Sequence, residues 1–102
     1  MKFTLTGRHF EITPYLKSRI NEKVKKFEHV SDNIIEVEIV LFKDSVNHVA
    51  EGKLHLGHTM LAAKGLGKDM YIAVNDLVAK LLLQIKRHEG KLRDRKRQPR
   101  PD

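Results

Sequence analysis

The last third of the chain carries a row of mostly basic side chains at helical spacing. The row consists of Lys80, Gln84, Arg87, Lys91 and Arg95. Steps of three or four residues bring side chains onto one face of a helix. Ammonium and guanidinium groups are the side-chain groups that pair with phosphate. The row is therefore a candidate phosphate-binding edge.

The net charge of the chain is concentrated at the same end. Residues 86–102 hold eight Lys or Arg against three Asp or Glu, which is a surplus of five out of a total net charge of +7. A surplus of this kind fits either a solvated helix end or a polyanion-binding surface. Nucleic acid is favoured over an anionic membrane, because the basic half of the helix has no large aromatic or leucine face to insert into lipid.

Other chemistries have weaker support. His55 and His58 are three residues apart, so on a strand they would face opposite sides, and no metal site is expected. Glu36 and Glu38 share a strand face but have no evident polar partner for acid–base catalysis. The segment GLGKD at residues 65–69 lacks the spacing of a phosphate-binding loop and is predicted to be a turn. We expect no enzyme activity, no cofactor and no small-molecule substrate.

Two amphipathic helices are predicted. One begins at Thr13-Pro14, a cap followed by proline at the first helical position, and is ended by residues 31–33. The other runs from Asp69, as N-cap or first-turn residue, to Arg97. The inward stripes are Leu16, Ile20, Val24 and Phe27 in the first helix, and Met70, Ala73, Val74, Leu77, Val78, Leu81, Ile85 and Leu92 in the second.

Four strands are predicted from alternating patterns at residues 2–7, 34–42, 49–56 and 59–64. In the second strand, Ile35, Val37, Ile39 and Leu41 are expected on the buried face. Gly57-His58 would close a tight hairpin between the last two strands. The fold class is α+β with the order strand, helix, three strands, helix: a four-stranded sheet with both helices on one face, whose first two strands are parallel because a helix connects them.

The chain length of 102 residues allows one domain, predicted at residues 1–97 and followed by a flexible tail at residues 98–102. No apolar run approaches the roughly 20 residues of a membrane span. The first ten residues lack the layout of a signal peptide. The chain has no cysteine, which excludes a disulfide framework. A cytoplasmic location without membrane association is expected.

Two stretches carry a resemblance to a known family. They are TLTGRHFEITPYLKSRINEKVKKFEHV near the start and DMYIAVNDLVAKLLLQIKRHEGK in the second helix. The chain resembles the short ribosome hibernation promoting factors, a family also called ribosome-associated inhibitors or sigma-54 modulation proteins. The resemblance implies a topology like that of double-stranded RNA-binding domains. It also implies binding to the small ribosomal subunit and its rRNA, in the channel used by mRNA and tRNA, and repression of translation by occupancy.

The resemblance also implies which residues meet rRNA. Asp69, Met70 and Asn75 are expected to cap and pack, whereas Tyr71 is expected to contact RNA. One departure from the family is Leu82-Leu83, where members often have a Glu-Arg pair; this run either widens the buried face or creates an exposed apolar spot. The expected rRNA-binding residues are Arg8, Lys23, Lys26, Tyr71, Lys80, Lys86, Arg87, His88, Lys91 and Arg95.

Among short members, some promote ribosome pairing with a separate ribosome modulation factor, and others hold single ribosomes inactive. A basic tail that ends in QPRPD favours the former, with storage of inactive ribosomes in stationary phase or stress. The alternatives are a generic double-stranded RNA-binding module and a protein-interaction domain without ribosome specificity.

Overall fold

The computed structural model describes the backbone of residues 1–96 and the side chains of residues 1–90. The expected tail at residues 98–102 lies outside this range. The elements follow the predicted order, which confirms the α+β fold class. They are β1 (Lys2–Gly7), α1 (Pro14–Val30), β2 (Ile34–Lys43), β3 (His48–Leu56), β4 (Thr59–Gly67) and α2 (Met70–Lys96).

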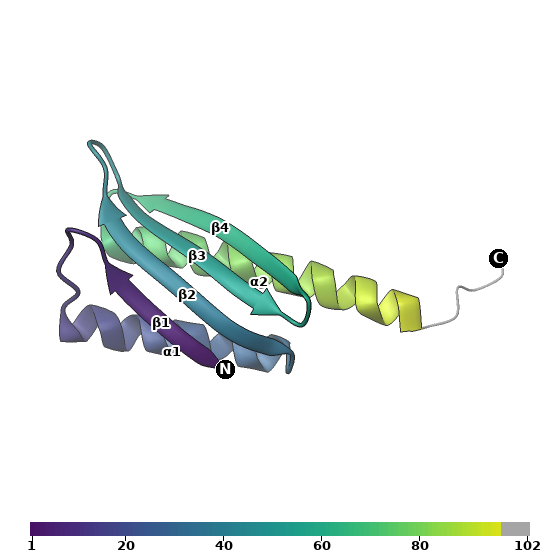
Figure 1. The fold of residues 1–102 in the computed structure, drawn as a ribbon. Helices are drawn as coiled ribbons and strands as arrows, with labels where there is room; N and C mark the ends of the chain where they lie inside the picture. Colours follow the sequence, from purple (N-terminus) through teal and green to yellow (C-terminus); the bar gives the residue numbers. More distant parts are fainter. Residues whose placement is uncertain (97–102) are drawn as a thin grey trace.

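The four strands form one sheet in the order β1-β2-β3-β4. β1 is parallel to β2, with Phe3 opposite Val37, as predicted from the helical connection. The pairs β2–β3 and β3–β4 are antiparallel. Both helices cover the same face of the sheet, and α2 continues beyond the end of the sheet (Figure 1). The opposite face, called the open face below, has no helix over it.

Both helices begin at the predicted caps. The Thr13 hydroxyl oxygen accepts a hydrogen bond from the Leu16 amide at 3.2 Å, and Pro14 follows as the first helical residue. The Asp69 carboxylate accepts from the Ile72 amide at 2.9 Å. Each cap satisfies an amide that the helix itself leaves without a partner, which typically stabilises a protein by about 1 kcal/mol.

The core lies between the helices and the sheet, and it contains the predicted stripes of both helices up to Ile85. The side chain of Leu92 lies outside the described range. Leu82 packs against the core, whereas Leu83 is 50% exposed. The pair Leu82-Leu83 therefore does both of the things considered from the sequence: it widens the buried face and leaves an apolar spot.

The predicted facing of β2 is wrong at its first residues. Ile34 is buried, whereas Ile35, expected in the core, is 58% exposed. The cause is a bulge, because Ile34 lies opposite Leu56 and Glu36 lies opposite His55, which leaves Ile35 without a partner on β3. An extra residue in one strand reverses the alternation on either side of it. From Val37 onward the predicted facing is confirmed.

The predicted turn at residues 65–69 is also too long. β4 continues to Gly67 and pairs with His48, so only Lys68 and Asp69 connect it to α2. Gly65 is buried, and a Cβ atom there would overlap the Ala73 carbonyl oxygen and the Leu77 amide nitrogen of α2. This glycine lets the backbone of α2 lie directly against β4.

Candidate nucleic-acid interface

The two helices are joined side to side at both ends of α1. The rings of Tyr15 and Tyr71, one residue into each helix, lie 6.0 Å apart between centroids. At the other end, the Ser31 hydroxyl donates a 2.6 Å hydrogen bond to a carboxylate oxygen of Glu89. α1 and α2 therefore run in the same direction over matching lengths, and their adjoining sides form one continuous surface.

Basic side chains gather along this surface. On α1, steps of four, four and three residues from Tyr15 reach Arg19, Lys23 and Lys26, which places all three on the side of α1 that adjoins α2. On α2, Asn75 and Lys86 lie between Tyr71 and Glu89 on the side of the helix that adjoins α1. We call this set the inter-helix surface: Tyr15, Arg19, Lys23, Lys26, Tyr71, Asn75 and Lys86. Four of the predicted residues, Lys23, Lys26, Tyr71 and Lys86, thus share one surface.

A second side of α2 is engaged with the sheet. Asp76 accepts a 3.1 Å hydrogen bond from the Leu66 amide, Lys80 donates a 2.8 Å bond to the Lys64 carbonyl, and Gln84 donates a 2.9 Å bond to the Ala62 carbonyl. Four helical residues advance about 6.0 Å and two strand residues about 6.6 Å, so the two spacings match. We call these three side chains the edge ladder, because they form hydrogen bonds with successive backbone groups along the outer edge of β4.

The edge ladder corrects the expectation for Lys80. The sequence placed Lys80 in the row that forms a candidate phosphate-binding edge, but its ammonium group contacts both the Lys64 carbonyl and, at 3.0 Å, the Asp76 carboxylate. The Lys80 ammonium and the Leu66 amide together lower the pKa of Asp76 below its ordinary value. β4 is an edge strand, and the exposed backbone groups of an edge strand can pair with another chain. Lys80 occupies one of these groups and so has a structural role. An additional contact with RNA stays a prediction.

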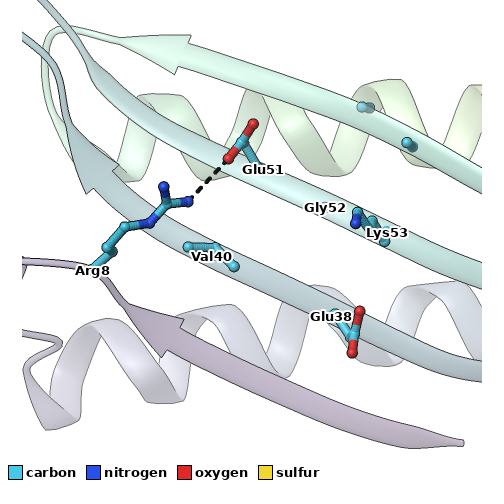
Figure 2. A pocket seen from close by; sticks show the side chains of 8 residues that line it. Arg8, Glu38, Val40, Glu51, Gly52 and Lys53 are labelled. Atoms are coloured by element: carbon cyan, nitrogen blue, oxygen red, sulfur yellow. Dashed lines mark hydrogen bonds and ion pairs between the residues drawn. The ribbon is translucent and has the colours of Figure 1, made fainter.

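Arg8 lies on the open face of the sheet, away from the inter-helix surface (Figure 2). Its guanidinium lies 4.6 Å from the centroid of the Phe42 ring and 3.4 Å from a carboxylate oxygen of Glu51. Glu51 also pairs with Lys64 at 3.8 Å. Arg8 and the lysines of α1, predicted as one set of binding residues, therefore belong to two opposite faces.

Opposite charges are matched across the rest of the open face. Glu38 lies opposite Lys53, and Glu36 lies opposite both Lys2 on β1 and His55 on β3. Cross-strand pairs of this kind stabilise a sheet and leave little net charge for a polyanion. Glu36 and Glu38 both lie on this face, as predicted. The distance from the His55 Nδ1 to a Glu36 carboxylate oxygen is 3.8 Å.

The remaining predicted residues lie toward the end of α2. Arg87 is exposed and lies three residues after Gln84, on the side of the edge ladder. His88 is half-buried. Lys91 and Arg95 belong to the helix, but their side chains lie outside the described residues.

The two histidines with metal-ligand spacing lie near the hairpin of β3 and β4. His58 is in the turn between the two strands and His55 is on β3. Within the described residues, no three His, Cys, Asp or Glu side chains come together as a metal site would require. Over the residues that the structure describes, neither helix combines the length and the apolarity needed to cross a membrane.

The sequence did not single out Tyr15 and Arg19, which belong to the inter-helix surface. Both are exposed residues of α1, and the sequence signal available was their spacing of four residues, continued by Lys23. That spacing shows a common face but does not show which face adjoins α2. The contact between Tyr15 and Tyr71 supplies this information.

A four-stranded sheet with two helices on one face and the order β-α-β-β-β-α defines a small α+β protein. A family model described as "Sigma 54 modulation protein / S30EA ribosomal protein" matches residues 3–93. The chain belongs to this family.

Similar proteins agree with this assignment. The chain is 36% identical over 93 residues to a ribosome hibernation promoting factor of Klebsiella oxytoca, covering 91% of this chain and 98% of that protein. The protein of the same name from Escherichia coli K12 is 34% identical over the same length and coverage.

Solved structures share the fold. A ribosomal subunit interface protein from Coxiella burnetii superposes with a TM-score of 0.83 at 22% identity, covering 88% of this chain and 99% of that chain. The N-terminal domain of Thermus thermophilus Protein Y gives a TM-score of 0.79 at 25% identity, covering 86% and 99%.

Proposed function

We propose that this protein is a ribosome hibernation factor that binds the small ribosomal subunit in the channel used by mRNA and tRNA. It represses translation by occupying that channel, without cleaving or modifying RNA. Family membership and the names of the relatives support the ribosome as partner. Since ribosomes are the partner, the protein would act in the cytoplasm, and it would promote the storage of inactive ribosomes in stationary phase or stress.

The observation that carries the proposal is the contrast between the two sides of the molecule. The inter-helix surface presents Arg19, Lys23, Lys26 and Lys86 from two parallel helices, whereas the charges of the open face are matched across the strands. Basic side chains outnumber Glu22 on this part of α1. Lys and Arg that contact phosphates displace counterions from RNA, which is a main source of affinity for a phosphate backbone. Among the residues that the structure describes, the helical side therefore supports phosphate binding better than the open face does.

The experiment is sedimentation of purified small subunits with the protein at increasing salt. We expect co-sedimentation at low salt, with an affinity that falls by a logarithmic slope of about 0.7 to 0.9 per neutralised phosphate. A short RNA duplex of arbitrary sequence serves as the control ligand. Equal affinity for the duplex and the subunit would favour a generic double-stranded RNA-binding module, and binding to neither would leave a protein-interaction domain.

A sedimentation profile of whole ribosomes tests the storage role. With a separate ribosome modulation factor present, we expect the protein to increase the fraction of paired ribosomes. Inactive ribosomes that remain single under the same conditions would assign the protein to the members that act on single ribosomes.

A further inference from the structure

The inter-helix surface contains an aromatic pair in addition to its basic residues. Tyr15 of α1 and Tyr71 of α2 have ring centroids 6.0 Å apart and ring planes inclined at 55°. Tyr15 is 64% exposed and Tyr71 is 41% exposed. Neither ring belongs to the hydrophobic core formed by the described residues. Two tyrosines that are far apart in the sequence thus lie together in solvent.

The pair is held in place by the helices that carry it. Each tyrosine lies in a capped first turn. Thr13 caps the turn of α1 that contains Tyr15, and Asp69 caps the turn of α2 that contains Tyr71. A tyrosine side chain has only two rotatable torsions that position its ring, so it loses little entropy on binding. The two rings are therefore a preorganised aromatic surface, and adjoining exposed aromatic groups of this kind commonly mark a binding site.

The surroundings indicate what the pair would bind. Arg19 and Lys23 follow Tyr15 at successive helical turns and outnumber Glu22 between them, and the Asp69 carboxylate at the start of α2 is engaged with the Ile72 amide. A ligand that fits has a planar group next to a chain of negative charges. An RNA nucleotide has both features, and its base must be unpaired, because the faces of bases within a duplex are already stacked.

We propose that Tyr15 and Tyr71 together form a stacking site for one unpaired RNA base, whose flanking phosphates pair with Arg19 and Lys23. Because the rings are inclined and not parallel, the base stacks on the face of one ring while its edge meets the other ring. This inference rests on the proposed function and deepens it, since it specifies an unpaired segment of RNA as the ligand of this end of the inter-helix surface.

The composition of the chain provides a direct measurement. Tyr15 and Tyr71 are its only two tyrosines, so protein labelled with 3-fluorotyrosine gives one ¹⁹F signal per ring, each assigned with a Tyr→Phe variant. The probes are a short single-stranded oligoadenylate, an abasic oligonucleotide of equal length, and a duplex. We expect both signals to shift with oligoadenylate and to stay nearly unchanged with the abasic strand and the duplex. Equal shifts with all three probes, or none with any, would overturn the stacking site.

Variants connect the stacking site to the ribosome. Tyr15→Leu with Tyr71→Leu should weaken small-subunit binding about tenfold or more, whereas Tyr15→Phe with Tyr71→Phe should retain it, because stacking needs the ring and not the hydroxyl. Melting curves confirm that each variant is folded. Leucine variants that bind subunits as tightly as wild type would refute the proposal.

The two proposals fail in different ways. If wild-type protein does not sediment with small subunits, the proposed function fails, whereas a shift caused by oligoadenylate alone still supports the stacking site. A different result separates the stacking site from the proposed function. If the protein sediments with subunits, but its two ¹⁹F signals shift with ribosomal proteins stripped of RNA and not with oligoadenylate, the tyrosine pair contacts protein. The stacking site is then wrong.

Discussion

Lys80 of α2 donates a 2.8 Å hydrogen bond to the backbone carbonyl of Lys64 on β4. A residue that looks from the sequence like free positive charge is thus part of the attachment between α2 and the edge of the sheet. Among the described basic residues of α2, Lys80 thus lies along β4 in a structural role, whereas Lys86 lies along α1 on the proposed binding surface.

Lys80→Glu should destabilise the domain. The new carboxylate would face the Lys64 carbonyl and lie one helical turn from Asp76, so a hydrogen bond is replaced by repulsion. Because the Lys80 side chain is half exposed, we expect a loss of about 1 to 2 kcal/mol in the free energy of unfolding, or roughly 4 to 15 °C in Tm. The matched control is Lys86→Glu, which should melt within about 0.5 kcal/mol of wild type. Equal melting of the two variants would contradict the structural role of Lys80.

Charge reversal on the inter-helix surface should reduce ribosome binding without unfolding the protein. Lys26→Glu with Lys86→Glu replaces two exposed cations from two helices, and small-subunit affinity should fall at least about tenfold at ordinary salt. The control pair, Lys43→Glu with Lys53→Glu, changes the net charge equally on the strands and should reduce affinity much less. Because position 53 lies opposite Glu38, a melting curve first establishes that this pair is folded. If both pairs lost affinity equally, net charge and not this surface would determine binding.

Leu81→Ala and Leu83→Ala compare two leucines of the same helix. Leu81 is fully buried, and its truncation should lower the free energy of unfolding by about 2 to 5 kcal/mol. Leu83 is 50% exposed, so its truncation should change stability by no more than about 0.5 kcal/mol. Chemical denaturation of both variants tests the facing of α2, which would be wrong if Leu83→Ala were the more damaging change.

Asp76 should make stability depend on pH in acid. Lys80 and the Leu66 amide lower its pKa in the folded protein from the ordinary value of 3.8. Its contribution is therefore complete above the unfolded pKa and is lost as pH falls through the lowered folded pKa. We expect wild type to be more stable than Asp76→Asn at pH 6, by a margin that shrinks once pH falls below about 4. Urea unfolding at a series of pH values measures the margin, and a constant or growing margin in acid would be inconsistent with this role.

Local sequence signals predicted the elements well. The caps at Thr13 and Asp69 act within three residues, so the starts of both helices could be located without tertiary information. The facing of Ile34 and Ile35 could not, because a bulge is defined by pairing with β3 and two adjacent isoleucines give no alternation to follow. Sequence also extended the turn before α2 over Gly65, since glycine signals both a turn and a close backbone contact.

The candidate site shows the same division. Spacing along α2 identified a basic row, but only the position of β4 shows that Lys80 and Gln84 are hydrogen bonded to its carbonyl groups. Similarly, Arg8 follows β1 closely in the sequence, yet the face on which its side chain lies is fixed by Phe42 and Glu51 on neighbouring strands. Contacts between residues distant in sequence thus decided which basic residues share a surface.

The most direct test of the central claim is competition for the small subunit. Protein bound to purified small subunits is challenged with mRNA and initiator tRNA, and the amount that remains in the pellet is measured. If the inter-helix surface occupies the decoding channel, mRNA and tRNA together should displace the protein, and the protein in excess should displace them. If the protein stays bound to subunits that carry a full complement of mRNA and tRNA, the claim of occupancy is wrong.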